Sequence, residues 1–212
     1  MKRTLAIAAA GLIVFAAPAV GAKPEAKNVT ISATPTTIKF GGSVTLSGKL
    51  TGANNSGRAV TVEQDVYPLD TFANAGTATT NATGDWTLVQ QPSANTRYRA
   101  RSGNAESKTV DVMVRPAISL KLSDRTPAKG QRVRFSGKLC PERDGATVAL
   151  QRRSGTTWRT IRKPVLKDMP NTTCSSYSAR ARVRRDGAYR TRFLGDATNV
   201  AGNSRVRRAN VH

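Results

Sequence analysis

Hydrophobic and polar residues alternate along several short segments of the chain, which is the pattern of a β-strand with one buried face. Val44 and Leu46 alternate with serine and threonine, while Val133 and Phe135 alternate with arginine and serine. Glycine, asparagine, aspartate and proline interrupt these segments about every 8 to 12 residues. No hydrophobic stripe at helical spacing follows residue 22. The pattern therefore predicts an all-β chain folded as an antiparallel β-sandwich.

The chain also repeats itself with a period of about 90 residues, which is the length of a domain rather than of a solenoid unit. Residues 41–50 match residues 130–139, and both segments end in Ser-Gly-Lys-Leu. Further matches follow in the same order, pairing 57–64 with 145–152, 85–88 with 176–179, and 98–104 with 189–196. We therefore expect two tandem domains, 29–114 and 117–212, joined at 114–116.

Four segments of the second copy carry a resemblance to a known family. They are 130–139 (Gly-x-x-Val-x-Phe-Ser-Gly-Lys-Leu), 148–153, the strand around Trp158, and 186–190 (Asp-Gly-Ala-Tyr-Arg). These segments resemble bacterial immunoglobulin-like repeat domains of secreted and cell-surface proteins, and the resemblance extends over both copies. It implies an all-β fold of two tandem immunoglobulin-like antiparallel β-sandwich domains. Such modules serve as spacers, stalks or adhesive units.

The first 22 residues have the order of a secretory signal peptide. Lys2 and Arg3 are followed by an apolar run and by small residues ending at Ala22. Cleavage there gives a mature chain beginning at Lys23 that is secreted or held at the cell surface. The alternative is an N-terminal membrane anchor, although the run is short for a membrane span.

Cys140 and Cys174 are the two cysteines of the chain, and both lie in the second copy. An even number of cysteines in an exported protein indicates a structural disulfide, which we expect here. A metal or redox pair is the alternative, but CxxC spacing is lacking. The cysteines do not sit in mid-strand around a core tryptophan as in antibody domains, so this bond is expected to staple a loop.

Tyr98 and Tyr189 occupy matching positions near the start of the penultimate strand of each copy. In sandwich folds a tyrosine at this position hydrogen-bonds back across the corner between strands. We expect both tyrosines to be structural, and a substrate-stacking role is the alternative.

The residues needed for catalysis are sparse. The single histidine is His212, and no Gly-x-Ser-x-Gly motif occurs. Carboxylates that might act in pairs are Glu63 with Asp65, and Asp124 with Glu142 and Asp144, but strand ends and turns explain them. Residues 195–203 offer oxygen ligands with one carboxylate, a poor set for calcium. We expect no enzyme activity, no cofactor and no metal.

Charge is distributed unevenly along the chain. The whole chain carries a net charge of +21, and residues 115–212 hold 23 Lys and Arg against six Asp and Glu. Alternation places many of these arginines on outward strand faces. The candidate anion-binding residues are Arg132, Arg134, Arg180, Arg182, Arg184, Arg190, Arg192, Arg205 and Arg207. The first five are expected on the outer face of one sheet, and the last four, together with Arg153, on the other sheet.

Three interpretations of this charge remain open. The arginines are general solubilising surface residues, or they attach the protein to anionic polymers of the cell envelope or extracellular matrix. The third is extracellular nucleic-acid binding, which the absence of an aromatic stacking row disfavours. The favoured function is a secreted, non-catalytic structural or adhesive module whose basic second domain binds anionic polymers. A secreted carbohydrate-active or other hydrolase is the alternative from a different class.

Overall fold

The computed structural model describes residues 28–68 and 70–212, and the expected signal peptide lies outside them. All the regular structure in these residues is β-strand. The first repeat contains the strands β1 (Asn28–Val29), β2 (Ser32–Thr34), β3 (Thr37–Lys39), β4 (Val44–Thr51), β5 (Ala59–Val66), β6 (Ala73–Thr79), β7 (Asp85–Gln90), β8 (Thr96–Ser102), β9 (Ala105–Glu106) and β10 (Val110–Arg115).

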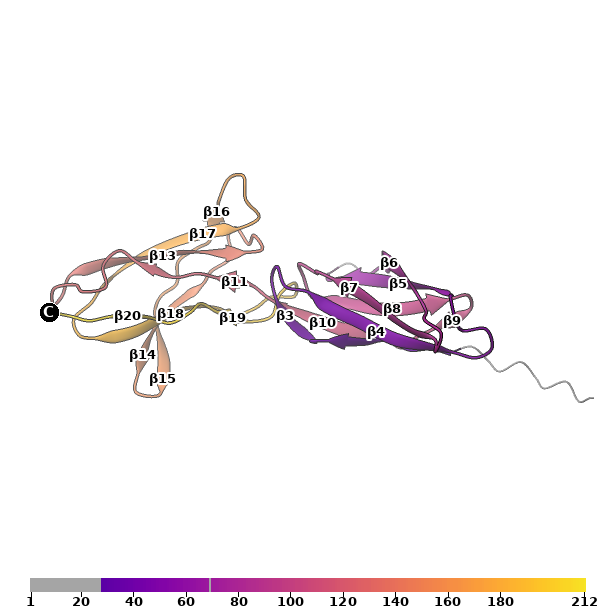
Figure 1. Cartoon of the computed structure of the whole chain (residues 1–212). Coiled ribbons are helices and arrows are strands. Elements are labelled where there is room, and N and C mark those ends of the chain that lie inside the picture. Colours follow the sequence, from indigo (N-terminus) through magenta and orange to yellow (C-terminus); the bar gives the residue numbers. More distant parts are fainter. Residues whose placement is uncertain (1–27, 69) are drawn as a thin grey trace, which may run out of the picture.

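The second repeat begins one residue after β10, beyond Pro116. It contains the strands β11 (Ala117–Ile118), β12 (Lys121–Leu122), β13 (Arg132–Cys140), β14 (Ala149–Ser154), β15 (Thr157–Arg162), β16 (Lys167–Asp168), β17 (Ser175–Arg182), β18 (Gly187–Phe193), β19 (Gly202–Asn203) and β20 (Arg207–Ala209). The two repeats lie end to end, with the C-terminus at the far end of the second (Figure 1).

Each repeat is a pair of sheets, and the order of the central strands is the same in both, although β3 and β16 have no counterpart in the other repeat. In the first repeat, β4 pairs with β1, β2 and β7, while β10, β8, β5 and β6 form the facing sheet. In the second repeat, β13 pairs with β11, β12 and β17, while β18 joins β14 to β19 and β20, and β15 adds to β14. The chain is therefore a tandem repeat of an all-β sandwich.

One pairing departs from the expected antiparallel sandwich. β3 runs parallel to β10, with Ile38 opposite Val114, whereas the other strand pairs are antiparallel. The chain leaves the first sheet after β2, at Pro35, and joins the second sheet as β3. A proline cannot donate a hydrogen bond to a sheet, so it suits the point where the strand changes partners.

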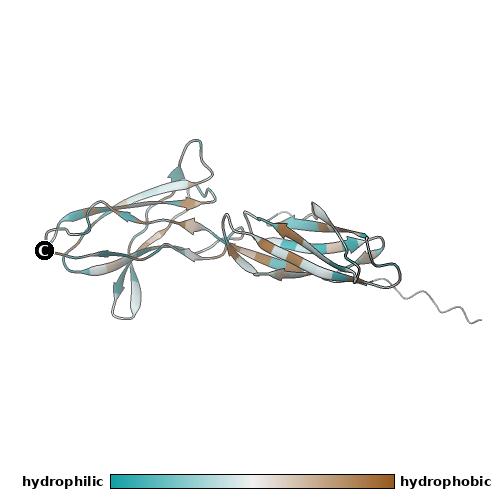
Figure 2. Ribbon diagram, viewed as in Figure 1, coloured by the Kyte–Doolittle hydropathy of each residue, from teal (hydrophilic) through white to brown (hydrophobic). Residues whose placement is uncertain are grey.

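The alternating hydrophobic residues form the cores of both repeats. Val44, Leu46, Val133 and Phe135 are fully buried, as the period-two pattern predicted. The ring of Phe135 packs against that of Tyr189 with 4.8 Å between centroids. Hydropathy follows this arrangement, with hydrophobic bands on the first repeat and mostly hydrophilic colour on the β14–β15 hairpin of the second (Figure 2).

The glycine of each Ser-Gly-Lys-Leu segment faces an aromatic residue on the neighbouring strand. Gly48 lies opposite Trp86, and Gly137 lies opposite Tyr177. A Cβ atom on Gly48 would meet the Trp86 ring at 2.8 Å, and one on Gly137 would meet the Tyr177 hydroxyl at 2.7 Å. In both copies the Cβ atom would come still closer to a backbone carbonyl oxygen, that of Thr30 or Ser119, so the repeated glycine is required by the close approach of backbone and of an aromatic side chain.

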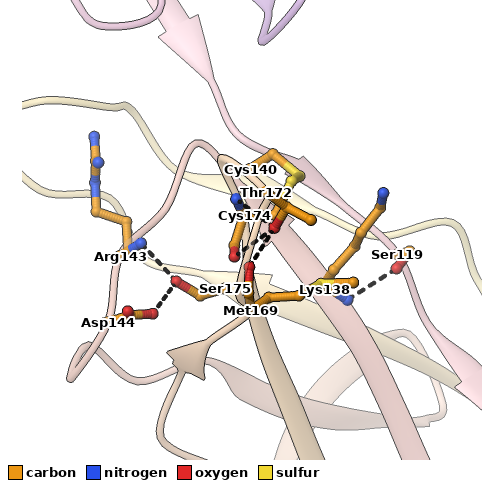
Figure 3. The surroundings of a disulfide bond; sticks show 9 residues. All are labelled: Ser119, Lys138, Cys140, Arg143, Asp144, Met169, Thr172, Cys174 and Ser175. Carbon is orange, nitrogen blue, oxygen red and sulfur yellow. Dashed lines mark hydrogen bonds between the residues drawn. A yellow bond between two sulfur atoms is a disulfide. The ribbon is translucent and has the colours of Figure 1, made fainter.

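The expected disulfide between Cys140 and Cys174 is present and joins two neighbouring strands of one sheet (Figure 3). Cys140 ends β13 and Cys174 directly precedes β17, and both cysteines are buried. The bond closes the 34-residue separation that contains β14, β15 and β16. It is a loop staple within a sheet, as expected, and not a bond between the two sheets.

Side-chain and backbone hydrogen bonds join the two repeats. The Asn199 side chain is fully buried and donates from Nδ2 to the carbonyl oxygens of Ser93 (3.1 Å) and Val114 (3.2 Å). Asn95 donates its backbone N–H to the carbonyl of Thr198 at 2.7 Å. The segment 195–203 is therefore the joint between the repeats.

Within residues 28–68 and 70–212, the structure contains no helix with the length and hydrophobicity of a membrane span.

Candidate anion-binding groove

Arginines face one another across the strand pair β13–β17. Arg132 lies opposite Arg182, and Arg134 lies opposite Arg180. Their neighbours Val133 and Phe135 point into the core, so the arginine side chains point outward and are exposed. Like charges directly opposite each other in a sheet are destabilising. Each arginine pair therefore favours an anion bound between its two members.

Three of these residues, with Arg184, line a groove of about 810 Å³ at the edge of the sandwich. Seven arginines surround this groove, and no aspartate or glutamate does: Arg132, Arg152, Arg162, Arg180, Arg182, Arg184 and Arg185. We call it the arginine groove. Its remaining lining is formed by Ile161, Ala181 and Tyr189. Guanidinium groups form paired hydrogen bonds with phosphate, sulfate or carboxylate groups, so this lining suits anionic ligands.

The strand order explains why the groove is open. β16 pairs with β17 only at Ser175 and Ser176, so the remainder of β17 lies at the edge of its sheet. β15 is the edge strand of the facing sheet. Arg162 on β15 bridges the gap by donating from Nε to the carbonyl oxygen of Arg180 at 3.2 Å.

Sequence reasoning missed three of the seven arginines, namely Arg152, Arg162 and Arg185. Arg152 lies on the same face of β14 as the buried Leu150, so alternation places it inward. The β14–β15 hairpin projects away from the body of the repeat (Figure 1), and Arg152 lines the arginine groove instead of a core. Its guanidinium donates to the carbonyl oxygen of Asp186 at 2.8 Å. Alternation in the sequence shows which face of β14 carries Arg152. It does not show where along the strand the hydrophobic core ends.

Ion pairing differs sharply between the repeats. Six of the seven ion pairs in the described residues lie in the first repeat, where Arg99, for example, donates to Glu63 at 2.6 Å. The one ion pair of the second repeat joins Arg143 to Asp196 at 3.1 Å, at the joint between repeats. The arginine groove therefore keeps its positive charge without an internal partner.

A second groove of about 910 Å³ lies over the other half of the β13–β17 face. Four cationic residues stand around it: Lys121, Arg134, Lys138 and Lys167. The segment between β15 and β17 contributes apolar atoms from Pro164, Val165 and Met169, and Val165 is 49% exposed. We call it the lysine groove. It combines a cationic rim with apolar walls.

The other four candidate arginines do not come together in one site. Arg190 stacks over the Trp158 ring at 4.3 Å and donates to Gln151 at 2.8 Å. Burial lowers the pKa of its guanidinium, and the neighbouring charge of Arg192 adds to this. Arg192 lines a cavity at the joint between the repeats. Arg205 lies in the segment between β19 and β20, and Arg207 donates to the carbonyl oxygen of Leu120 at 3.1 Å. Trp158 is only partly buried, because it lies on the β14–β15 hairpin under Arg190.

Both tyrosines predicted to be structural are buried, but their expected corner hydrogen bonds need correction. The hydroxyl of Tyr98 is buried and has no hydrogen-bond partner among the described residues. The hydroxyl that reaches back to the backbone is that of Tyr177, which donates to the carbonyl of Ser119 at 2.5 Å and lies 2.7 Å from the Thr191 hydroxyl. The ring of Tyr189 contributes to packing against Phe135.

Two of the acidic residues considered for catalysis or metal binding, Glu63 and Asp196, have other contacts. Glu63 is ion-paired with Arg99, and Asp196 accepts from Arg143 and from backbone N–H groups of its own turn. Glu142, Asp144 and Asp168 place carboxylate oxygens within 4.8 Å of one another on the surface. The nearby charge of Asp144 and a hydrogen bond to it raise the pKa of Glu142. Exposed acidic groups of this kind are common without an ion.

No protein-family model matches the chain, and no curated protein matches it. Among solved structures, the chain is similar to a crystal structure of a tetra-tandem repeat in the extending region of a large adhesion protein. The identity is 14%, the TM-score is 0.39, and the match covers 87% of this chain and 49% of that one. This chain thus spans about half the length of the chain in that crystal structure.

Proposed function

We propose that the chain is a secreted, non-catalytic module of two immunoglobulin-like domains, 29–114 and 117–212, that binds anionic polymers of the cell envelope or extracellular matrix. The second domain carries the binding. Its buried disulfide is typical of exported proteins and supports an extracellular location. The signal-peptide pattern of residues 1–22 supports the same location.

The observation that carries the proposal is the arginine groove. Seven guanidinium groups with no lining carboxylate form a surface whose self-repulsion an external anion relieves. A purely solubilising surface intersperses both signs of charge, as the ion-paired first repeat does. Concentrating unpaired arginines on two neighbouring strands and a hairpin therefore favours a binding role.

The test compares two triple variants of the mature chain on immobilised heparin and on isolated cell envelope at graded salt. Arg180→Gln, Arg182→Gln and Arg184→Gln together remove three charges from the groove. The matched control replaces three exposed cations that line neither groove, Arg125, Lys129 and Arg208, with glutamine.

The groove variant is expected to elute at clearly lower salt than the control, because it has lost three of the charges that contact the polymer. Exposed contacts of this kind depend on salt, since charges are screened beyond about 8 Å at physiological salt. Replacing the same three arginines with lysine retains the charge but not the paired hydrogen bonds, so partial loss indicates forked contacts. Equal retention of the groove and control variants would refute the proposed site. No retention of the wild-type protein near physiological salt would refute the function.

A further inference from the structure

The outward residues of the β13–β17 pair form a continuous row of cations and hydroxyls. From the far end of the second repeat toward the joint, the opposed pairs are Arg132–Arg182, Arg134–Arg180, Ser136–Ser178 and Lys138–Ser176. Lys121 lies opposite Ser136 on the other side, and Lys167 lies opposite Ser176. We call this row, with the two grooves that flank it, the basic track.

The two grooves share a rim. Arg180 lines the arginine groove, and its cross-strand partner Arg134 lines the lysine groove. Strand residues advance about 3.4 Å each, so the six steps from Arg132 to Lys138 span about 20 Å. No aspartate or glutamate lines either groove. A ligand that follows the strands therefore meets cations repeatedly over this length.

The walls of the track differ from those of a nucleic-acid channel. Single-stranded nucleic acids stack their bases on exposed aromatic side chains. The aromatic residues that line these grooves, Tyr177 and Tyr189, are both buried. The lysine groove instead offers serine hydroxyls beside the aliphatic atoms of Pro164, Val165 and Met169. Hydroxyl-bearing rings with apolar faces and attached acidic groups match this surface.

We propose that the basic track binds a single extended chain of an acidic glycan, lying along β13 and β17 across both grooves. The proposal rests on the function proposed above and adds the class of polymer, its direction and a minimum length. Sulfate or carboxylate groups contact the arginine pairs, and sugar rings lie against the apolar wall of the lysine groove. A disaccharide fills only the arginine end, whereas an octasaccharide reaches both grooves.

The experiment measures affinities of heparin-derived disaccharide and octasaccharide for the mature chain at physiological salt by calorimetry. One variant removes the lysine end by Lys121→Gln, Lys138→Gln and Lys167→Gln. The control removes three charges outside the track at Arg125, Lys129 and Arg208. An uncharged variant, Val165→Ser, removes apolar contact at a side chain that is already half exposed and so retains the fold.

The octasaccharide is expected to bind at least tenfold more tightly than the disaccharide. The lysine-end variant should lower octasaccharide affinity at least fivefold while leaving the disaccharide unchanged, and the control should change both by less than twofold. Val165→Ser should weaken octasaccharide binding without altering its salt dependence.

Two results would overturn the track while leaving anion binding intact. One is equal affinity for both fragments with no effect of the lysine-end variant. The other is tighter binding of single-stranded DNA of equal charge than of the octasaccharide. Failure of the wild-type protein to bind either fragment, or envelope, would instead overturn the proposed function itself.

Discussion

Replacing Gly137 with alanine should destabilise the second repeat selectively. A Cβ atom at this position would lie 2.1 Å from the carbonyl oxygen of Ser119 and 2.7 Å from the hydroxyl of Tyr177. The first contact is with backbone that β11 and β12 hold against β13, so it cannot relax cheaply. The same methyl group also displaces the hydrogen bond between Tyr177 and Ser119.

The expected cost combines overpacking with a lost hydrogen bond. Overpacking costs about 1–3 kcal/mol, and a typical hydrogen bond contributes about 0.5–1.5 kcal/mol. The sum is about 2–4 kcal/mol, which lowers the melting temperature of a domain of this size by about 10 to 20 °C. Differential scanning calorimetry of the mature chain should show one transition shifted and the other unchanged.

Three further variants test the prediction made for Gly137→Ala. Gly48→Ala should shift the other transition, because its Cβ meets the Thr30 carbonyl oxygen at 1.8 Å. Ser178→Ala, on the exposed face of β17, should change stability by less than about 0.5 kcal/mol. Adding Tyr177→Phe to Gly137→Ala should not rescue it, because the clash with the Ser119 carbonyl remains. A Gly137→Ala protein that melts like the wild type would refute the close-approach argument.

Three other predictions concern the staple, the buried tyrosines and the joint. Reducing Cys140–Cys174 should destabilise the second repeat by about 3–4 kcal/mol in the chain-entropy model and leave the first unaffected, which calorimetry with and without reductant would show. Burial raises the pKa of Tyr98 and of Tyr177 to about 12, so the folded state holds these protons more tightly than the unfolded chain. Their contribution to stability is therefore present below pH 10 and lost as the pH rises from about 10 to 12, where Tyr98→Phe should reduce the loss in a urea titration. Asn199→Ala removes the hydrogen bonds that the Asn199 side chain forms across the joint. Small-angle X-ray scattering should then show a broader distribution of distances between the repeats. An unchanged scattering profile would contradict the role given to Asn199.

The architecture was largely predictable because its signals are local. Alternation at Val44, Leu46, Val133 and Phe135 depends only on the period of a strand, and each of these side chains is buried as predicted. The repeated Ser-Gly-Lys-Leu segment indicated two copies, and these share the order of their central strands. Alternation likewise placed the arginines of β13 and β17 on the outer face of one sheet.

The details of the site were less predictable because they depend on where strands end. Arg190 and Arg192 alternate in the same way as Arg180 and Arg182, yet one is covered by Trp158 and the other lies at the joint. Arg152 was assigned no role, because an inward position on a strand normally belongs to a core. The corner hydrogen bond expected of Tyr98 does not form among the described residues, and Tyr177 instead donates to the distant Ser119 carbonyl, a contact that only the folded chain reveals.

The sequence by itself determined the strands, their buried faces, the tandem repeat, the disulfide and the excess of positive charge in the second half. Each of these follows from periodicity, from internal similarity or from counting, which need no knowledge of spatial neighbours. Tertiary structure alone decided that Arg132 faces Arg182, that Arg162 reaches Arg180 from the other sheet, and that residues 195–203 join the repeats. Those contacts link residues far apart in the chain, and they depend on register and strand order, which short-range patterns do not encode.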